Sequence, residues 1–402
     1  MPAAPAPPRA YLDHSATTPV RPEVLDVLVE QLRRLGNPSS LHASGRAARR
    51  VVEESRESIA GALGARPADV VFTSGGTEAD NLAVKGIASA RRGADHSRTR
   101  VLASAVEHHA VLDSLDWLGE QGFDVRLLDV DDTGRLRTDL LRDLLADDPG
   151  SVALLSCMWA NNEVGTIQPL DEVVALARVA GVPVHSDAVQ AISTLPVDFA
   201  ASGLDAMTVT AHKLGGPVGV GALLTRRELA VAPLLHGGGQ ERQIRSGTLD
   251  APAIAAFACA LAIAVDVRDR LHARLEELRG ELVDRVLASV PDVVVNGQTR
   301  AALRLPGIAH LGFRGCEGDS LLMLLDAAGV ECSTGAACTA GVPQPSHVLL
   351  AMGQADDAAR GSLRFSLGHT STPADVDAVA GVIGQVVDRA RRAGQAVPSG
   401  GR

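Results

Sequence analysis

Thr208-Val209-Thr210-Ala211-His212-Lys213-Leu214-Gly215-Gly216-Pro217 is the stretch from which the fold and the chemistry can be read. Its lysine comes directly after an apolar, β-branched run and directly before a glycine turn, which predicts an amine at the end of a strand. Such an amine is suited to a Schiff base with an aldehyde cofactor. A surface lysine in a loop is the alternative. The chain has only two lysines, however, and Lys85 falls in a predicted helix, which favours the functional interpretation of Lys213.

Two further motifs complement this lysine. Ser74-Gly75-Gly76-Thr77-Glu78 joins a predicted strand to a predicted helix, where two glycines and a helix N-terminus can approach an anion. Asp187 follows the apolar run 182–185 and could bond a protonated heterocyclic nitrogen at a strand end. Either motif alone would also fit an ordinary capped turn. Together with Lys213 they meet three needs of pyridoxal phosphate: a phosphate cradle, a counter-ion for the ring nitrogen and a lysine for the aldehyde.

Strand and helix patterns alternate from about residue 50 to 225. The periodicity predicts helices over 53–63, 77–89 and 109–121, and strands over 70–73, 101–104, 125–128, 152–156 and 182–185. Such alternation indicates an α/β fold with a mostly parallel sheet covered on both faces, which binds ligands at the carboxyl ends of its strands. Beyond residue 247 a long helix over 252–288, a strand over 363–366 and a helix over 374–390 predict a second, smaller α+β domain.

The expected domain boundaries follow from these patterns. Residues 1–10 are a disordered lead-in, and 11–255 form a large cofactor-binding domain whose N-terminal segment contributes to the small domain. Residues 256–392 form that small domain, including a cysteine-bearing loop over 332–345, and 393–402 are a flexible tail.

Composition excludes several classes of protein. The net charge of -10 argues against direct nucleic-acid binding. The longest apolar run, 253–265, is too short to cross a bilayer, so no membrane association is expected. We find no secretory signal, and five cysteines in 402 residues do not make a disulfide framework, which favours a reducing cytoplasm.

Nearly the whole chain outside its two tails resembles the cysteine desulfurases of the class V aminotransferase fold, the NifS- and IscS-like group with a long mobile cysteine loop. Besides the motifs above, the resemblance rests on Tyr11 to Pro19, Gly36 to Ser40, Glu107-His108, Asn161 to Gly165, His236 to Arg242, Arg245 to Thr248, Ser333 to Pro345 and Arg364 to Gly368. One departure is Ala211, where many relatives carry glycine; one methyl near the phosphate should be tolerable.

The resemblance implies a pyridoxal-phosphate-dependent transferase of fold type I, with a mostly parallel seven-stranded sheet in its large domain. Lys213 would hold the cofactor and move the α-proton, and His108 would stack on the ring and exchange protons near the substrate sulfur. Asn162 and Arg364 would bind the substrate carboxylate. A satisfied core histidine and a structural ion pair remain alternatives for His108 and Arg364. The implied cofactor contacts are Gly76, Thr77, His108, Asn162, Asp187, Gln190, Thr210, His212 and Lys213, with Thr248 supplied by the neighbouring subunit of a homodimer.

Cys338 is expected to be the nucleophile. It lies in a run of small residues without periodicity, Ser333 to Pro343, which predicts a mobile loop. Its thiolate could attack the sulfur of the substrate and carry it away as a persulfide. Cys157 and Cys259 lie in apolar segments and fit buried, inert cysteines. Cys332 could be a resolving thiol under oxidation, but a plain small residue at a strand end is the favoured interpretation.

We therefore expect a cysteine desulfurase that converts L-cysteine to L-alanine and passes sulfur from Cys338 to acceptor proteins for iron–sulfur cluster assembly and thiolation. A selenocysteine lyase or another class V enzyme would share most of these residues, although a transaminase needs no thiol on a loop. A metal-dependent hydrolase could use the ligands His108, His109, His185, Asp187 and His212, but no HxxH or HExxH spacing supports it. A non-enzymatic scaffold is the third alternative; the presence of both Lys213 and Cys338 argues against it.

Overall fold

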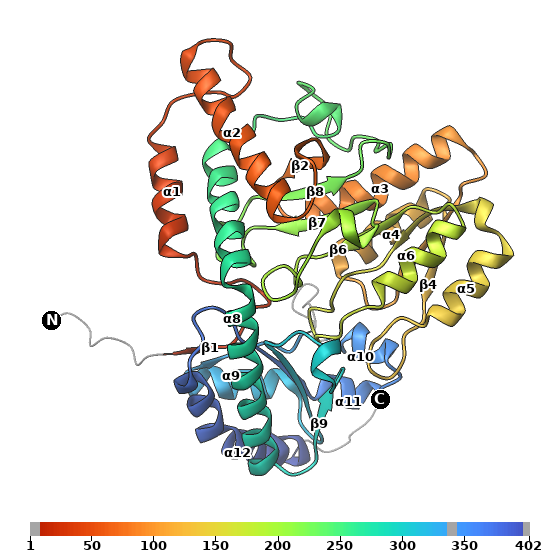
Figure 1. The fold of residues 1–402 in the computed structure, drawn as a ribbon. Coiled ribbons are helices and arrows are strands. Elements are labelled where there is room, and N and C mark those ends of the chain that lie inside the picture. The colour runs from red at the N-terminus through yellow and green to blue at the C-terminus, as the bar shows by residue number, and fades with distance from the viewer. Residues whose placement is uncertain (1–8, 336–343, 397–402) are drawn as a thin grey trace.

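A seven-stranded sheet forms the centre of the molecule (Figure 1). The computed structural model describes residues 9–335 and 344–396, with side chains to residue 393. In spatial order the strands are β2 (Val70–Thr73), β8 (Gly221–Thr225), β7 (Ala206–Thr210), β6 (Val184–Asp187), β5 (Val152–Ser156), β3 (Arg100–Ser104) and β4 (Asp124–Leu128). Only β8 runs antiparallel to its neighbours. The expected mostly parallel α/β sheet is therefore confirmed.

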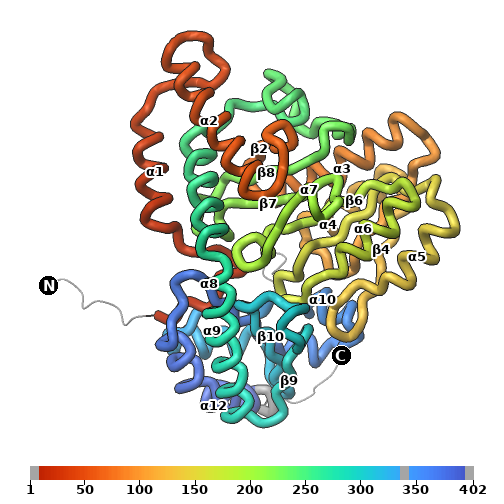
Figure 2. The backbone as a smooth tube through the Cα atoms, in the orientation of Figure 1, coloured from red at the N-terminus to blue at the C-terminus, as the bar shows by residue number. Residues whose placement is uncertain are grey.

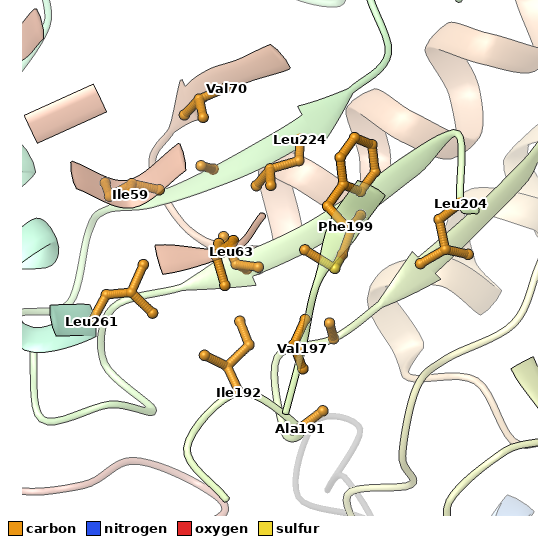
Figure 3. Close-up of a cluster of buried hydrophobic side chains, with 14 of the residues drawn as sticks. Ile59, Leu63, Val70, Ala191, Ile192, Val197, Phe199, Leu204, Leu224 and Leu261 are labelled. Atoms are coloured by element: carbon orange, nitrogen blue, oxygen red, sulfur yellow. The ribbon is translucent and has the colours of Figure 1, made fainter. Parts of the chain in front are cut away.

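Helices cover both faces of this sheet because successive residues of each strand point to opposite faces. On one face Val71, Val101 and Leu223 pack with α3 and α4; on the other, Val70 and Leu224 join a core that includes α2, α6 and α8 (Figure 3). The helices of this part are α1 (Pro22–Leu32), α2 (Ala43–Ala62), α3 (Gly76–Ala94), α4 (His109–Glu120), α5 (Thr138–Asp147), α6 (Leu170–Val179) and α7 (Phe199–Ser202). Short 3-10 turns occur at Pro67–Asp69, Pro149–Ser151, Glu241–Gln243 and Ala301–Leu303.

The helices expected to end at residues 89 and 390 continue to Ala94 and Ala396, and two predicted starts differ from the structure by more than one residue. The helix expected over 53–63 begins at Ala43, where the His42 side chain accepts a hydrogen bond from the Gly45 N–H. Its first turns bury little before Val52, so apolar periodicity does not reveal them. The strand expected from 182 begins at Val184, because Pro183 has no N–H to donate to the sheet.

A second body lies beside the first and has its own apolar core. Its antiparallel sheet has the order β12 (Ser362–Ser366), β10 (Ile308–Phe313) and β9 (Val293–Asn296). The N-terminal β1 (Ala10–Tyr11) pairs in parallel with β11 (Val330–Glu331). The remaining helices are α9 (Gly318–Ala327), α10 (His347–Ala351), α11 (Asp356–Arg360) and α12 (Pro373–Ala396). Figure 2 traces the chain from β1 in this body to α1 and α2, and later back along α8.

The long helix α8 (Ala251–Ser289) joins the two bodies. Residues between Ala251 and Ala264 belong to the core of the central sheet, and residues between Leu271 and Val286 belong to the second core. Among the described residues it is the one helix long and apolar enough to cross a membrane by length and composition. Half of its most apolar window is buried inside the protein, and it packs against α1, α2 and α12, as a core helix of a globular protein does.

Candidate active site

A cavity of about 400 Å³ opens at the carboxyl ends of β5, β6 and β7. Ten of the residues predicted from the sequence line it: Gly76, Thr77, His108, Asn162, Asp187, Gln190, Thr210, His212, Lys213 and Arg364. Thr248 does not line the cavity of its own chain and is exposed. Cys338 falls outside the described residues, but Ser333, Gly335 and His347 on either side of it line the cavity. The topology thus brings together groups that are dispersed over nearly 300 residues of sequence.

Lys213 lies three residues beyond the end of β7. Its ammonium donates hydrogen bonds to the carbonyl oxygens of Ser15 and Ala16, the latter at 2.7 Å. The turn that carries it requires glycine, because a Cβ on Gly216 would lie 2.8 Å from the Cβ of Ala211. Burial, together with the positive charge of Arg364, lowers the pKa of Lys213 to about 8. The amine is therefore more readily neutral than an exposed lysine, as a nucleophile or a base must be.

Asp187 is the last residue of β6 and is buried. One carboxylate oxygen accepts a 2.8 Å hydrogen bond from the Val189 N–H. Burial raises the pKa of Asp187, whereas this hydrogen bond and the charge of Lys213 oppose the rise. Gln190, three residues on, donates from Nε2 to the Ser15 carbonyl oxygen at 3.0 Å. Asp187 is therefore a desolvated carboxyl group that a cation in the cavity would stabilise.

The N-terminus of α3 faces the same cavity. No side chain of residues 9–335 or 344–393 caps this helix, and its N-cap residue Gly75 has φ 152°, a conformation that favours glycine. A Cβ on Gly76 would lie 3.3 Å from the Val189 side chain, so the glycine keeps the backbone accessible from the cavity. Thr210 and His212 lie on the wall nearby. Uncapped N–H groups at the positive end of a helix are suited to a phosphate group.

His108 caps the next helix, α4. Its Nδ1 accepts a 3.1 Å hydrogen bond from the Ala110 N–H, which leaves Nε2 as the protonated nitrogen of a neutral ring. Desolvation by the surrounding protein, followed by the charge of Lys213, lowers the pKa of His108 to about 4. The imidazole is exposed where the cavity opens, so it is not a satisfied core histidine. It is available to stack on a planar ligand.

Arg364 in β12 reaches the cavity from the second body. Its Nη2 donates to a carboxylate oxygen of Asp13 at 2.7 Å, and its Nη1 donates to the Asn162 carbonyl oxygen at 3.0 Å. Its Nε is buried without a hydrogen-bond partner among the described residues. The arginine therefore makes a structural ion pair, as the alternative interpretation held, and still has a donor for a substrate carboxylate.

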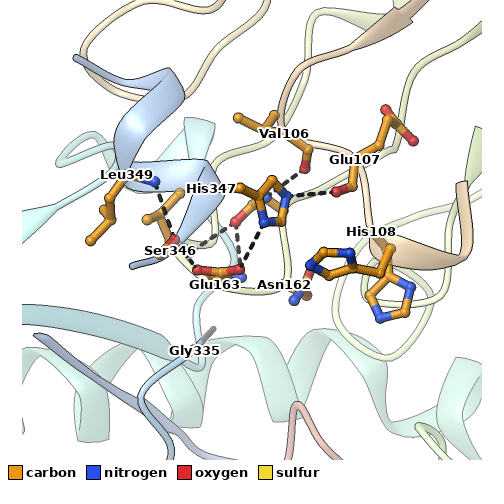
Figure 4. Close-up of polar contacts among 12 residues, drawn as sticks. Val106, Glu107, His108, Asn162, Glu163, Gly335, Ser346, His347 and Leu349 are labelled. Atoms are coloured by element: carbon orange, nitrogen blue, oxygen red, sulfur yellow. Dashed lines mark hydrogen bonds and ion pairs between the residues drawn. The ribbon is translucent and has the colours of Figure 1, made fainter. Parts of the chain in front are cut away.

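A buried polar cluster that the sequence did not reveal lies at the edge of the cavity (Figure 4). Glu163 accepts a 2.5 Å hydrogen bond from the Ser346 hydroxyl, and its other oxygen lies 4.0 Å from the His347 ring. His347 donates from Nε2 to the Glu107 carbonyl oxygen at 2.9 Å. Burial raises the pKa of Glu163 to about 7. Glu163 lies within the stretch Asn161 to Gly165 and His347 just beyond Pro345, but no local pattern marks either as part of the site.

These residues fit pyridoxal phosphate. The uncapped helix end can hold the phosphate, the buried carboxyl of Asp187 can pair with the ring nitrogen, and the amine of Lys213 can reach the aldehyde. By contrast, the described residues contain no group of three or more His, Cys, Asp and Glu side chains that could hold a metal ion. Of the ligands considered for a hydrolase, His185 is fully buried and bonds to Ser156 and Thr208 instead.

Comparison with known proteins agrees with this geometry. Residues 10–379 match the model of the family Aminotransferase class-V. The chain belongs to this family. It is 57% identical to an IscS-like cysteine desulfurase of Mycobacterium tuberculosis over 98% of this chain and 100% of that protein. It is 41% identical to cysteine desulfurase IscS of Methanosarcina thermophila over 96% and 94% of the two chains.

Solved structures place this class V chain in the same group. A NifS-like protein superimposes with a TM-score of 0.87 at 33% identity, covering 95% of this chain and 100% of the other. A NifS-like protein from Rickettsia africae superimposes with a TM-score of 0.85 at 30% identity, covering 94% and 99%. The resemblance to the NifS- and IscS-like cysteine desulfurases, and with it the type I fold, is therefore confirmed.

The described cysteines of this class V chain are not placed as nucleophiles. Cys157 and Cys332 are buried, and Cys259 is half-buried in α8 instead of fully buried as expected. Burial raises the pKa of Cys332 to about 12, which keeps its sulfur in the unreactive thiol form and argues against a resolving role.

Proposed function

We propose that the chain is a cysteine desulfurase that uses pyridoxal phosphate to convert L-cysteine to L-alanine. The observation that carries this proposal is the convergence of Lys213, Asp187, His108 and Arg364 on one cavity of about 400 Å³. The names of the relatives support it, because proteins 57% and 41% identical to this chain over nearly their whole length are called cysteine desulfurases. A solved structure titled as a complex with cysteine also shares the fold, with a TM-score of 0.77.

Residues from both bodies of the protein would bind the cofactor and the substrate. The N-terminus of α3, Thr210 and His212 would hold the phosphate, while Asp187 and Gln190 would hold the ring and His108 would cover it. When bound, pyridoxal phosphate supplies an electron sink for the carbanion left at the α-carbon of the amino acid. Arg364 and Asn162 would bind the substrate carboxylate from the second body.

Proton and sulfur transfer then depend on Lys213 and Cys338. Lys213, whose pKa burial lowers, removes the α-proton as a neutral amine. Cys338, which lies outside the described residues, attacks the substrate sulfur as a thiolate. The bond between the β-carbon and sulfur breaks with its electron pair remaining on carbon, and the β-carbon takes up a proton to become the methyl group of alanine. Lys213 then returns a proton to the α-carbon. The sulfur stays on Cys338 as a persulfide, so one cysteine and one thiol give one alanine and one persulfide.

The cellular setting is part of the proposal. The persulfide would pass to acceptor proteins for iron–sulfur cluster assembly and thiolation, in the cytoplasm, without direct binding to nucleic acid or membrane. The enzyme would be a homodimer in which Thr248 serves the neighbouring cavity; its exposure on its own chain supports this role. We also propose a large domain up to about residue 255 and a small domain beyond it, with the boundary inside α8.

The direct test incubates the purified protein with L-cysteine and quantifies alanine and protein-bound persulfide for wild type and Cys338→Ala. Alanine formation with loss of the persulfide in the variant would support both the activity and its nucleophile. A yellow protein that binds pyridoxal phosphate and forms no alanine would contradict the desulfurase activity, and selenocysteine and keto acids would then be tested.

A further inference from the structure

Asp80 is a second buried carboxyl group on the wall of the cavity. It lies in α3, four residues after Gly76, and is only 1% exposed. Its Oδ1 has no hydrogen-bond partner among the residues that the structure describes, and the nearest basic atom, His185 Nε2, is 3.6 Å away. A buried carboxylate oxygen without a partner is costly. Asp80 therefore requires an explanation that the binding of phosphate and substrate does not give.

A chain of hydrogen bonds across three strands leads to Asp80. Ser156 in β5 bonds to His185 Nδ1 at 3.0 Å, and His185 Nε2 bonds to Thr208 Oγ1 at 3.0 Å. Burial raises the pKa of Asp80 well above its ordinary value, and a hydrogen bond from Thr208 opposes this rise without cancelling it. Because a hydroxyl has one proton to donate, Thr208 then accepts from His185, and His185 in turn accepts from Ser156. This series of hydrogen bonds directs donors toward Asp80 and offsets part of the cost of charging it, although burial still favours the neutral carboxyl.

The groups that face Asp80 do not supply a cation for it. Asp187 lies beside Thr208 in the register of β6 and β7, and its negative charge, like that of Glu107, raises the pKa of Asp80. His185 is neutral because burial lowers its pKa to about 3. Lys213 lowers the pKa of Asp187, but no cation of the described residues is among the groups that shift the pKa of Asp80, so ionising both desolvated carboxyls requires a further positive charge in the cavity. A protonated nitrogen heterocycle in the cavity would provide that charge.

We propose that Asp80 is a positioning residue that acts with Asp187 to keep the ring nitrogen of pyridoxal phosphate protonated. In the empty cavity the two carboxyls share one proton. When the cofactor binds, that proton moves to the ring nitrogen, so a cation faces two carboxylates and no proton is exchanged with solvent. The inference rests on the proposed function, since it concerns the cofactor of that activity.

The test uses full-length protein reconstituted with pyridoxal phosphate labelled with ¹⁵N in the ring. The ¹⁵N chemical shift reports protonation of the ring nitrogen, and titration of the apoprotein followed by visible absorbance reports affinity. We expect Asp80→Asn to move the shift toward the unprotonated value and to weaken binding about 10-fold, the effect of one pKa unit. Thr208→Val should act in the same direction and less strongly. The matched control Asp171→Asn removes an exposed carboxylate of α6 and should change neither readout.

The outcomes separate the two proposals. If wild type does not bind pyridoxal phosphate, the proposed function fails and the role of Asp80 fails with it. If wild type binds it with a protonated ring nitrogen and both Asp80→Asn and Thr208→Val keep the wild-type shift and affinity, only the role of Asp80 is overturned. The Thr208→Val variant keeps the test decisive if Asp80→Asn does not fold.

Discussion

Lys213 can react with an aldehyde only as a neutral amine, so its pKa controls how fast the apoprotein takes up its cofactor. Burial lowers this pKa to about 8 from the ordinary 10.5. We expect the rate of covalent attachment of pyridoxal phosphate, followed by visible absorbance, to rise with pH and to level off above about pH 9. A rate that keeps rising to pH 10.5 would contradict the desolvation of Lys213; Lys213→Ala is the control and should show no attachment.

At the same scale, Glu163 links protonation to stability. Burial raises its pKa to about 7 from the ordinary 4.5, so the folded state holds a proton that the unfolded state releases between these values. Stability therefore falls as pH rises through this interval. Glu163→Gln removes this contribution. In this interval its free energy of unfolding should therefore fall less steeply with pH than that of wild type, by up to about 1.4 kcal/mol per pH unit. Denaturant unfolding at several pH values measures this, and equal slopes in both proteins would refute it. Burial also raises the pKa of Glu107, to about 8, and this residue is present in both proteins. The stability of each protein therefore still falls with pH to some extent.

Residues of this kind mark the limit of what the sequence could predict. Lys213 and the turn 74–78 could be identified because the strand, turn and helix signals around them are local. Glu163 and Ser346 are 183 residues apart, and neither carries a signal until the fold brings them together. The same holds for Asp80, which in the sequence is one polar position of an ordinary amphipathic helix.

At the scale of elements, a buried ion pair supports a strained turn. Glu241, Arg242 and Gln243 all have positive φ, at 44°, 59° and 64°, a conformation that non-glycine residues rarely adopt. The Glu241 carboxylate accepts two hydrogen bonds from Arg56 in α2, at 2.7 and 2.9 Å, and one from the Phe72 N–H in β2 at 2.8 Å. These contacts hold the turn against both elements.

Replacing one partner of the Arg56–Glu241 ion pair should destabilise the fold more than replacing both partners. Arg56→Met leaves the Glu241 carboxylate buried without its partner, and we expect it to cost about 3–5 kcal/mol of unfolding free energy. The double variant Arg56→Met/Glu241→Met should recover part of this loss, as a double-mutant cycle in denaturant would show. If the loss in the double variant equals the sum of the losses in the two single variants, the two side chains do not stabilise each other.

The element scale also shows why the strands were predicted more accurately than the helix ends. β2 and β5 are entirely buried runs bounded by turns, and both have the predicted bounds. The first ten residues of α2 were missed because they bury almost nothing before Val52. The order of the strands, and the antiparallel course of β8, depend on contacts between distant segments that no local pattern encodes.

At the scale of the whole molecule, the proposed dimer makes a prediction about the cofactor. Thr248 is exposed and does not line the cavity of its own chain, so its proposed contribution to binding requires a second chain. We expect Thr248→Ala to weaken pyridoxal phosphate binding about 10-fold, the loss of one hydrogen bond to a charged group, without changing the sedimentation coefficient. A monomeric wild-type protein with full affinity would contradict both the dimer and this role of Thr248.

α8 has a mechanical consequence for the molecule. All 39 of its residues are helical, with its one proline in the first turn, so it spans about 58 Å without a break at which the backbone could rotate. A hinge needs a few residues whose dihedral angles can change, and α8 offers none between the two cores. α8 is thus a rigid connection between the body that carries Lys213 and the body that carries Arg364. In the proposed desulfurase, these two residues would select a substrate by the length between its amine and its carboxylate, and a longer amino-acid backbone would be rejected.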